Sequence, residues 1–348
     1  MSEQALAACA KSLVGSGKGL LAMDESNPTC NRRFAALGIP QTVEMRHAYR
    51  ELLVTTPGLA DSISGAILYD ETIHQRDRHG RRFTDWLTKA GIIPGIKVDL
   101  GTRPLALHAG EMVTEGLDGL RDRLAEYAEM GARFAKWRAV IGLDGDHPSV
   151  ACIQANMQVL ARYAALCQEA GMVPIVEPEV LMAGAHSLER CRSVTGRVLT
   201  VLFEELRIQG VILEGVILKS NMVLPGLDCS TQQSVQTVAA ATIASMVRTV
   251  PAKVAGIAFL SGGQSPELAS ARLNAMNDPS LLNHGPWPLV FSFARALQQP
   301  ALESWRGEET NVAAAQAALI HRARCNHAAL SGAYDAVTDS DLGYRKAS

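Results

Sequence analysis

The sequence predicts a single (β/α)8 TIM barrel, and two observations carry that prediction. Short apolar runs, often rich in β-branched residues, recur roughly every 40 residues, which is the spacing of units made of one strand and one helix. Amphipathic stretches lie between these runs, and no Ser/Gly linker or low-complexity segment divides the 348 residues. Eight alternating units in one undivided chain are typical of a closed barrel.

Each expected element is placed by its own pattern. The apolar runs predict strands at residues 19–24, 65–70, 95–100, 134–140, 173–179, 215–219, 256–260 and 289–293. Apolar residues at helical spacing predict helices at residues 115–131, 149–171, 187–210 and 230–250. An open doubly wound sheet is the alternative, but DESNPTC follows the first run where that fold would carry G-x-G-x-x-G. We expect the barrel to cover residues 1–335 and residues 336–348 to form a mobile C-terminal tail.

Composition excludes several classes of partner. The chain has 33 basic and 35 acidic residues, so no general field attracts nucleic acid or an anionic membrane. No run approaches the ~18 apolar residues of a membrane span, and the N-terminus does not resemble a signal peptide. Seven scattered cysteines without C-x-x-C indicate reduced thiols and a cytoplasmic protein. The nine histidines form no H-x-H or H-E-x-x-H, so we expect no metal site, and His321 and His327 are interpreted as ordinary helix residues.

Polar residues stand at or just after the ends of the predicted strands. In a barrel these ends meet on one face, where active sites of this fold lie. Side chains two apart on a strand share a side, so Lys136 should point with Arg138, and Glu177 with Glu179. A purely structural ion-pair network is the alternative for any one of them. The full set is Asp24, Lys97, Asp99, Lys136, Arg138, Glu177, Glu179, Lys219, Ser261 and Arg295.

Lys219 ends an apolar run, GVILK, that reads as a buried strand. Lysine is almost never buried without a partner, so this position suggests chemistry. A desolvated amine beside a second cation loses its proton more easily, and Lys136 is the candidate cation. A neutral lysine attacks ketones to form a Schiff base, while carboxylates move the protons. The iminium then accepts electrons when an adjacent carbon–carbon bond breaks.

Two groups of residues predict phosphate sites. The stretch FLSGGQS at residues 259–265 follows the seventh strand, and its glycines let backbone N–H groups approach an anion. Arg295, after the eighth strand, adds a charged fork. Arg32, Arg33 and Lys97 form a second basic group, with solvated surface charge as the favoured interpretation for Arg32. The two sites predict a substrate phosphorylated at both ends.

Seven motifs in order resemble the class I fructose-1,6-bisphosphate aldolases over about residues 15–325. They are AMDES, GIKVD, AKWR, IVEPE, VILKSNMV, FLSGGQS and FSFARALQ. The resemblance implies an enzyme without metal or cofactor, a homotetramer of barrels whose partner is a phosphorylated sugar. It implies reversible cleavage of fructose 1,6-bisphosphate to dihydroxyacetone phosphate and glyceraldehyde 3-phosphate, in glycolysis, gluconeogenesis or the Calvin cycle.

The resemblance also implies roles for individual residues. Lys219 is the Schiff-base nucleophile, Glu177 is the acid/base of carbinolamine dehydration with Glu179 beside it, Asp24 accepts the C4 hydroxyl proton, and Lys136 supplies the neighbouring charge. The residues implied for the C1 phosphate are Ser261, Gly262, Gly263, Ser292 and Arg295. Arg33, Lys97 and Arg138 match further substrate-binding positions.

The sequence departs from the family pattern in three places. Ser220 follows the lysine where animal members have proline, and Thr29 and Arg32 replace a serine and a lysine of the C6-phosphate loop. Animal members end in a tyrosine that enters the active site, whereas this chain ends YRKAS, which leaves Tyr344 as a weak candidate for that tyrosine.

Two alternative functions remain. One is a transaldolase, with one phosphate site, and the other is a non-catalytic scaffold barrel.

Overall fold

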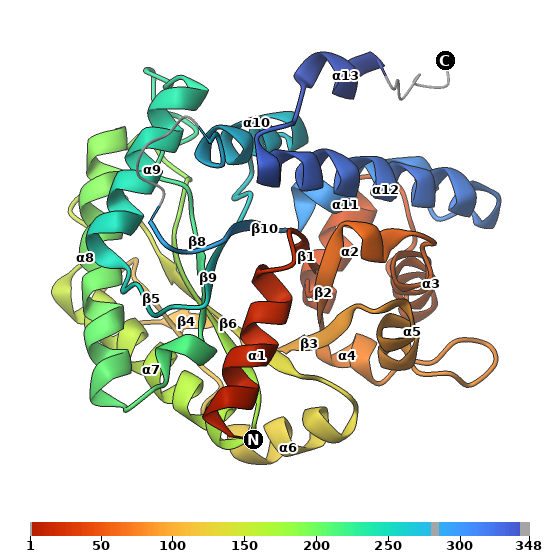
Figure 1. Ribbon diagram of the computed structural model, residues 1–348, viewed down its shortest axis with the longest axis horizontal. Coiled ribbons are helices and arrows are strands. Elements are labelled where there is room, and N and C mark those ends of the chain that lie inside the picture. Colours follow the sequence, from red (N-terminus) through yellow and green to blue (C-terminus); the bar gives the residue numbers. More distant parts are fainter. Residues whose placement is uncertain (1, 280–284, 342–348) are drawn as a thin grey trace.

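The computed structural model describes residues 2–279 and 285–341. Its centre is a closed barrel of eight parallel strands (Figure 1), so the predicted fold class is confirmed and the open doubly wound sheet is excluded. Around the barrel the strands follow the order β1, β10, β9, β8, β7, β6, β3, β2. In chain order they are β1 (Gly19–Ala22), β2 (Ile63–Leu68), β3 (Ile93–Lys97), β6 (Phe134–Ile141), β7 (Val173–Val180), β8 (Ile217–Ser220), β9 (Gly256–Phe259) and β10 (Leu289–Phe293).

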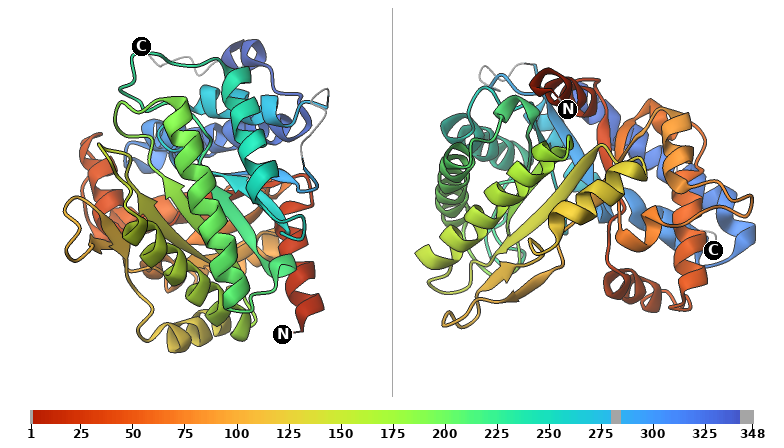
Figure 2. Two further views of the ribbon diagram at one scale, coloured as in Figure 1. Left: turned by 90° about the vertical axis from the view of Figure 1, so that its left-hand side faces the viewer. Right: turned by 90° about the horizontal axis from the view of Figure 1, so that it is seen from below.

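Helices surround the strands (Figure 2). The α-helices are α1 (Glu3–Val14), α2 (Asn27–Ala35), α3 (Val43–Val54), α4 (Asp70–Ile73), α5 (Phe83–Ala90), α6 (Leu120–Glu129), α7 (Val150–Glu169), α8 (Leu188–Ile208), α9 (Val235–Thr249), α10 (Pro266–Met276), α11 (Arg295–Trp305), α12 (Val312–Ala328) and α13 (Ala336–Asp341). Short 3-10 turns are η1 (Leu59–Asp61), η2 (Leu213–Gly215), η3 (Glu309–Asn311) and η4 (Ala329–Ser331). No helix within the described ranges is both long and apolar enough to cross a bilayer.

Some predicted boundaries were wrong. An antiparallel hairpin, β4 (Thr102–Pro104) with β5 (Met112–Thr114), precedes α6, so that helix begins at Leu120 and not at residue 115. Helix α9 begins at Val235 and not at residue 230, because the Ser234 hydroxyl caps it by accepting a bond from the backbone N–H of Thr237 at 3.1 Å. The sequence did not predict the hairpin, because strands of three residues carry almost no periodic signal.

The amino end of the barrel is closed by α1. Its buried face packs on apolar residues that point inward from the strands; the cluster includes Leu6, Ala10, Leu13, Val14, Leu20, Phe134, Ile175 and Ile217. Glycine lets the helix approach closely, since a Cβ at Gly65 or at Gly256 would lie only 2.6 Å from a side-chain carbon of α1. This end therefore forms an apolar plug, and it leaves the carboxyl end as the open mouth of the barrel.

The C-terminal segment begins as a helix. Residues 336–341 form α13, while residues 342–348, including Tyr344, lie outside the described part of the chain. The domain boundary at residue 335 and the mobility of the tail stay predictions.

Candidate active site

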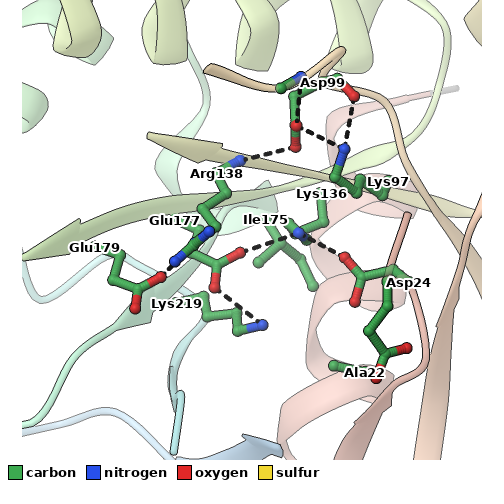
Figure 3. A network of polar contacts seen from close by, with 12 residues as sticks. Ala22, Asp24, Lys97, Asp99, Lys136, Arg138, Ile175, Glu177, Glu179 and Lys219 are labelled. Carbon is green, nitrogen blue, oxygen red and sulfur yellow. Dashed lines mark hydrogen bonds and ion pairs between the residues drawn. The ribbon is translucent and has the colours of Figure 1, made fainter. Parts of the chain in front are cut away.

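Strands β6, β7 and β8 lie side by side and aim charged side chains into the mouth of the barrel (Figure 3). Strand β6 pairs with β7 so that Arg138 lies opposite Glu177, and Val140 opposite Glu179. Alternate residues of a strand share a side. The side chains of β6 and β7 that point into the barrel therefore lie next to one another. The structure thus brings together the charges that strand alternation predicted.

Lys219 is buried and does not reach out to water. Its side chain lies in β8, which continues to Ser220, and the residue is only 4% exposed. The Nζ atom lies 3.1 Å from Oε1 of Glu177, which is within hydrogen-bonding reach. A proton can therefore pass directly between this amine and this carboxylate.

Lys136 links two carboxylates. Its Nζ lies 2.5 Å from Oδ2 of Asp24 and 3.3 Å from Oε2 of Glu177. Oε2 makes no aligned hydrogen bond within the described residues, so this second contact is electrostatic. Burial by itself would lower the pKa of Lys136, but Asp24 and Glu177 outweigh burial and raise it. Lys136 is therefore a fixed positive charge at neutral pH.

The two carboxylates beside Lys136 are ionised. Burial would raise the pKa of Asp24, yet Lys136 and Lys219 outweigh it and lower that pKa to about 2. The pKa of Glu177 is also lowered, because Lys136 and Lys219 again outweigh burial. At neutral pH both side chains are therefore proton acceptors. Glu177 must first take up a proton, for which the Lys219 amine is placed, before it can act as an acid.

A second layer of ion pairs borders this centre. Arg138 pairs with Glu179, and its backbone N–H donates to Oδ2 of Asp99 at 3.2 Å. Lys97 Nζ lies 2.6 Å from the other oxygen of Asp99. The Arg138 side chain is 41% exposed, so a ligand at the mouth can reach it.

The loop after β9 has the shape of an anion cradle. Gly262 and Gly263 have φ of 55° and 100°, a left-handed conformation that glycine adopts without strain. Arg295 lies against this loop, since a Cβ at Gly263 would come within 3.1 Å of its Nη2. Ser292, buried in β10, has a hydroxyl without a hydrogen-bond partner among the described residues. The structure thus brings the predicted cradle residues Gly262, Gly263, Ser292 and Arg295 to the ends of β9 and β10, and their binding of an anion stays a prediction.

The second basic group is not assembled as a set of free cations. Arg33 pairs with Glu25, whose other oxygen accepts from Arg50 at 2.9 Å, and Lys97 is held by Asp99. Arg32 is exposed, as its solvated-charge interpretation predicted. Two of these three cations are thus paired with carboxylates in the described part of the chain, and the second phosphate site stays a prediction.

The sequence matches the family described as fructose-bisphosphate aldolase class-I over residues 5–347. The chain belongs to this aldolase family. Membership makes the protein a carbon–carbon lyase, and it disfavours the transaldolase and scaffold alternatives.

Aldolases from three different organisms are similar to the chain over nearly its whole length. A probable class 1 fructose-bisphosphate aldolase of Xanthomonas axonopodis pv. citri is 54% identical over 95% of this chain and 99% of the relative. The cytosolic fructose-bisphosphate aldolase 4 of Arabidopsis thaliana is 49% identical over 94% of this chain and 82% of the relative. The aldolase of Plasmodium falciparum, solved with TRAP and a small-molecule inhibitor, superposes with a TM-score of 0.93 at 45% identity, over 96% of both chains.

Two residues that support the cradle of this aldolase were not found from the sequence. Gln264 donates from Nε2 to the carbonyl of Ser261 at 2.9 Å, and its Oε1 accepts from buried Arg272 at 2.7 Å. Gln264 adjoins the SGG motif, so its place in FLSGGQS was the available signal. Arg272 lies eight positions further on, in α10, where only the folded helix shows its direction.

Proposed function

We propose that this aldolase cleaves fructose 1,6-bisphosphate reversibly to dihydroxyacetone phosphate and glyceraldehyde 3-phosphate through a Schiff base on Lys219. The observation that carries the proposal is the buried amine of Lys219 at 3.1 Å from Glu177, with Lys136 and Asp24 beside them. This group unites a nucleophile, an acid/base, a fixed cation and a second base.

The first half of the reaction forms the iminium. Glu177 takes a proton from Lys219, and the neutral amine attacks the C2 ketone to form a carbon–nitrogen bond. The nitrogen, now positively charged, gives a proton to the C2 oxygen, which becomes the hydroxyl of the carbinolamine. Glu177 then returns its proton to this hydroxyl, which leaves as water. The positive charge of Lys136 stabilises the oxygen while it carries negative charge, because both lie in a buried, low-dielectric site.

The second half breaks the C3–C4 bond. Asp24 accepts the proton of the C4 hydroxyl, and the aldehyde carbonyl of glyceraldehyde 3-phosphate forms as the bond breaks. The bonding electrons pass into the iminium and leave an enamine on Lys219. Asp24 then releases the proton that it accepted, and one proton adds to C3 of the enamine. Hydrolysis of the resulting iminium releases dihydroxyacetone phosphate and restores the free amine. Glu179 orients Arg138 at the edge of the site through their ion pair.

The substrate is held through its phosphates. The C1 phosphate occupies the cradle formed by Ser261, Gly262, Gly263, Ser292 and Arg295, where backbone N–H groups and the guanidinium are the donors. Arg33, Lys97 and Arg138 bind the remainder of the sugar phosphate. For Arg33 and Lys97 this requires that a phosphate or hydroxyl oxygen competes with the carboxylates that now hold them.

The proposed setting follows the family. The enzyme acts as a cytoplasmic homotetramer, without a nucleic-acid or membrane partner, and the cytosolic Arabidopsis relative supports that location.

A product assay tests the proposed reaction. Fructose 1,6-bisphosphate is supplied alone, without an acceptor aldose, after treatment of the enzyme with EDTA. We expect equal amounts of the two triose phosphates, because cleavage needs neither an acceptor nor a metal. Product formation only after an aldose is added would indicate group transfer, and activity that disappears with EDTA and returns with Zn²⁺ would contradict the Schiff-base route.

A further inference from the structure

Three side chains of metal-ligand type meet outside the active site, between α12 and α13. The Nε2 atom of His321 lies 2.8 Å from Oδ1 of Asp339, and the Sγ atom of Cys325 lies 3.3 Å from that same oxygen. Sγ and Nε2 are 3.7 Å apart. His321 and Cys325 share one face of α12 because they are four residues apart, and Asp339 comes from α13.

The spacing of the three atoms suits a zinc-sized ion. A circle through Nε2, Sγ and Oδ1 at these separations has a radius of about 1.9 Å, and zinc bonds to nitrogen, oxygen and sulfur measure roughly 2.0–2.3 Å. An ion bonded to all three atoms would therefore lie slightly out of their plane. That is the arrangement of three corners of a tetrahedron, with the fourth position left for water. The His321 side chain is 20% exposed and that of Asp339 is 5% exposed, so the three atoms lie just below the surface.

Outer partners hold the carboxylate in place. Asp339 Oδ2 accepts from Arg322 Nη1 at 2.5 Å and from the Tyr334 hydroxyl at 2.7 Å, while Arg322 also reaches Oδ1 at 2.7 Å. These hydrogen bonds orient the carboxylate, as ligating carboxylates commonly are oriented.

We propose that His321, Cys325 and Asp339 bind one zinc-type divalent ion that fastens α13 to α12. The combination of thiolate, imidazole and carboxylate selects zinc or cobalt over magnesium and calcium, which prefer oxygen ligands alone. On binding, the Cys325 S–H bond breaks, an S–metal bond forms and the proton leaves to solvent. Oxidation states do not change. The ion's role is structural, because the lysines and carboxylates of the active site supply the groups for cleavage. Binding of the ion by these three residues does not depend on the proposed reaction.

Metal titration of the full chain tests this site. The enzyme is stripped with EDTA, dialysed and titrated with Zn²⁺ by calorimetry and with Co²⁺ by absorption spectroscopy. We expect one ion per chain, a near-ultraviolet charge-transfer band from sulfur to cobalt, and a higher unfolding temperature with the ion. Cleavage activity at room temperature should be the same with and without it.

Variants assign the ligands. Cys325→Ser keeps the size but removes the thiolate, so it should abolish the charge-transfer band. Cys325→Ser and His321→Ala should each weaken Zn²⁺ binding by at least the roughly 10- to 100-fold that follows loss of an outer partner of a metal ligand. Cys229→Ser and exposed His327→Ala are the controls and should bind as the parent does.

Two results would overturn the proposal. One is the absence of stoichiometric Zn²⁺ binding to the stripped chain. The other is equal binding by the parent, Cys325→Ser and His321→Ala, which would place the ion elsewhere. If either variant unfolds, Asp339→Asn replaces it, because the amide keeps the size but is a poor ligand; unchanged affinity in that variant counts equally against the site.

Discussion

The two ends of the barrel are built from the same strands but in opposite ways. At the amino end, Leu6, Leu13 and Val14 of α1 pack on inward apolar residues, and glycine at Gly65 and Gly256 makes room for them. At the carboxyl end, Lys136, Glu177 and Lys219 stand in the same inward rows. Burial stabilises the first group, whereas for the second it carries a desolvation cost that ion pairing must offset.

This difference separates stability from chemistry within one barrel. An apolar plug tolerates a changed side chain at a cost in packing, without altering any titrating group. The charged end holds its groups at defined distances, and loss of one partner leaves another buried charge uncompensated. Changes at the amino end should therefore lower stability at constant turnover, and changes at the carboxyl end should lower turnover or ligand affinity.

The largest effect is expected at Glu177. Glu177→Gln keeps the shape but removes the group that exchanges protons with Lys219, and loss of a general acid/base typically costs 10²–10⁴-fold in rate. We expect kcat for fructose 1,6-bisphosphate cleavage to fall by about that factor, with a smaller change in KM. Glu205→Gln, a buried carboxylate in the outer helix α8, is the matched control and should keep its turnover. Near-normal turnover of Glu177→Gln would move the acid/base role to Glu179 or Asp24.

Leu13→Ala tests the amino end. The side chain is fully buried in the plug, so truncation leaves a cavity and should lower the stability by about 2–5 kcal/mol. We expect a lower unfolding temperature at matched protein concentration and unchanged kcat below that temperature. Gln4→Ala, on the exposed face of the same helix, should change neither quantity. A large loss of kcat in folded Leu13→Ala would show that the two ends are coupled.

A smaller effect is expected at Arg295 in the cradle. Arg295→Ala removes a charge and its donors, and a hydrogen bond to a charged group contributes about 1.5–3 kcal/mol, or roughly a 10- to 150-fold loss of affinity. Arg295→Lys keeps the charge but loses the planar fork, so it should lie between the parent and Ala. Binding of dihydroxyacetone phosphate should weaken, while glyceraldehyde 3-phosphate, which lacks the C1 phosphate, should bind nearly as before. Equal weakening of both ligands would show that Arg295 does not bind the C1 phosphate.

The sequence was sufficient to predict the barrel and to predict which side chains of its strands share a side. Alternation along β6 and β7 placed Lys136, Arg138, Glu177 and Glu179 correctly, because a strand fixes the side on which each residue lies. Periodicity along the chain did not predict contacts that depend on the path of a loop or on the docking of a helix. Arg33 of α2 pairs with Glu25 in the loop just before that helix, and His321 meets Asp339 only because α13 packs near α12.

The central claim is that Lys219 is the nucleophile, and borohydride trapping tests it most directly. The enzyme is treated with sodium borohydride in the presence of dihydroxyacetone phosphate, digested, and mapped by mass spectrometry. Reduction converts the iminium into a stable amine, so the peptide that contains Lys219 should gain the mass of the reduced ligand, and activity should be lost in proportion. Label on another lysine, such as Lys136, with Lys219 unmodified would contradict the account.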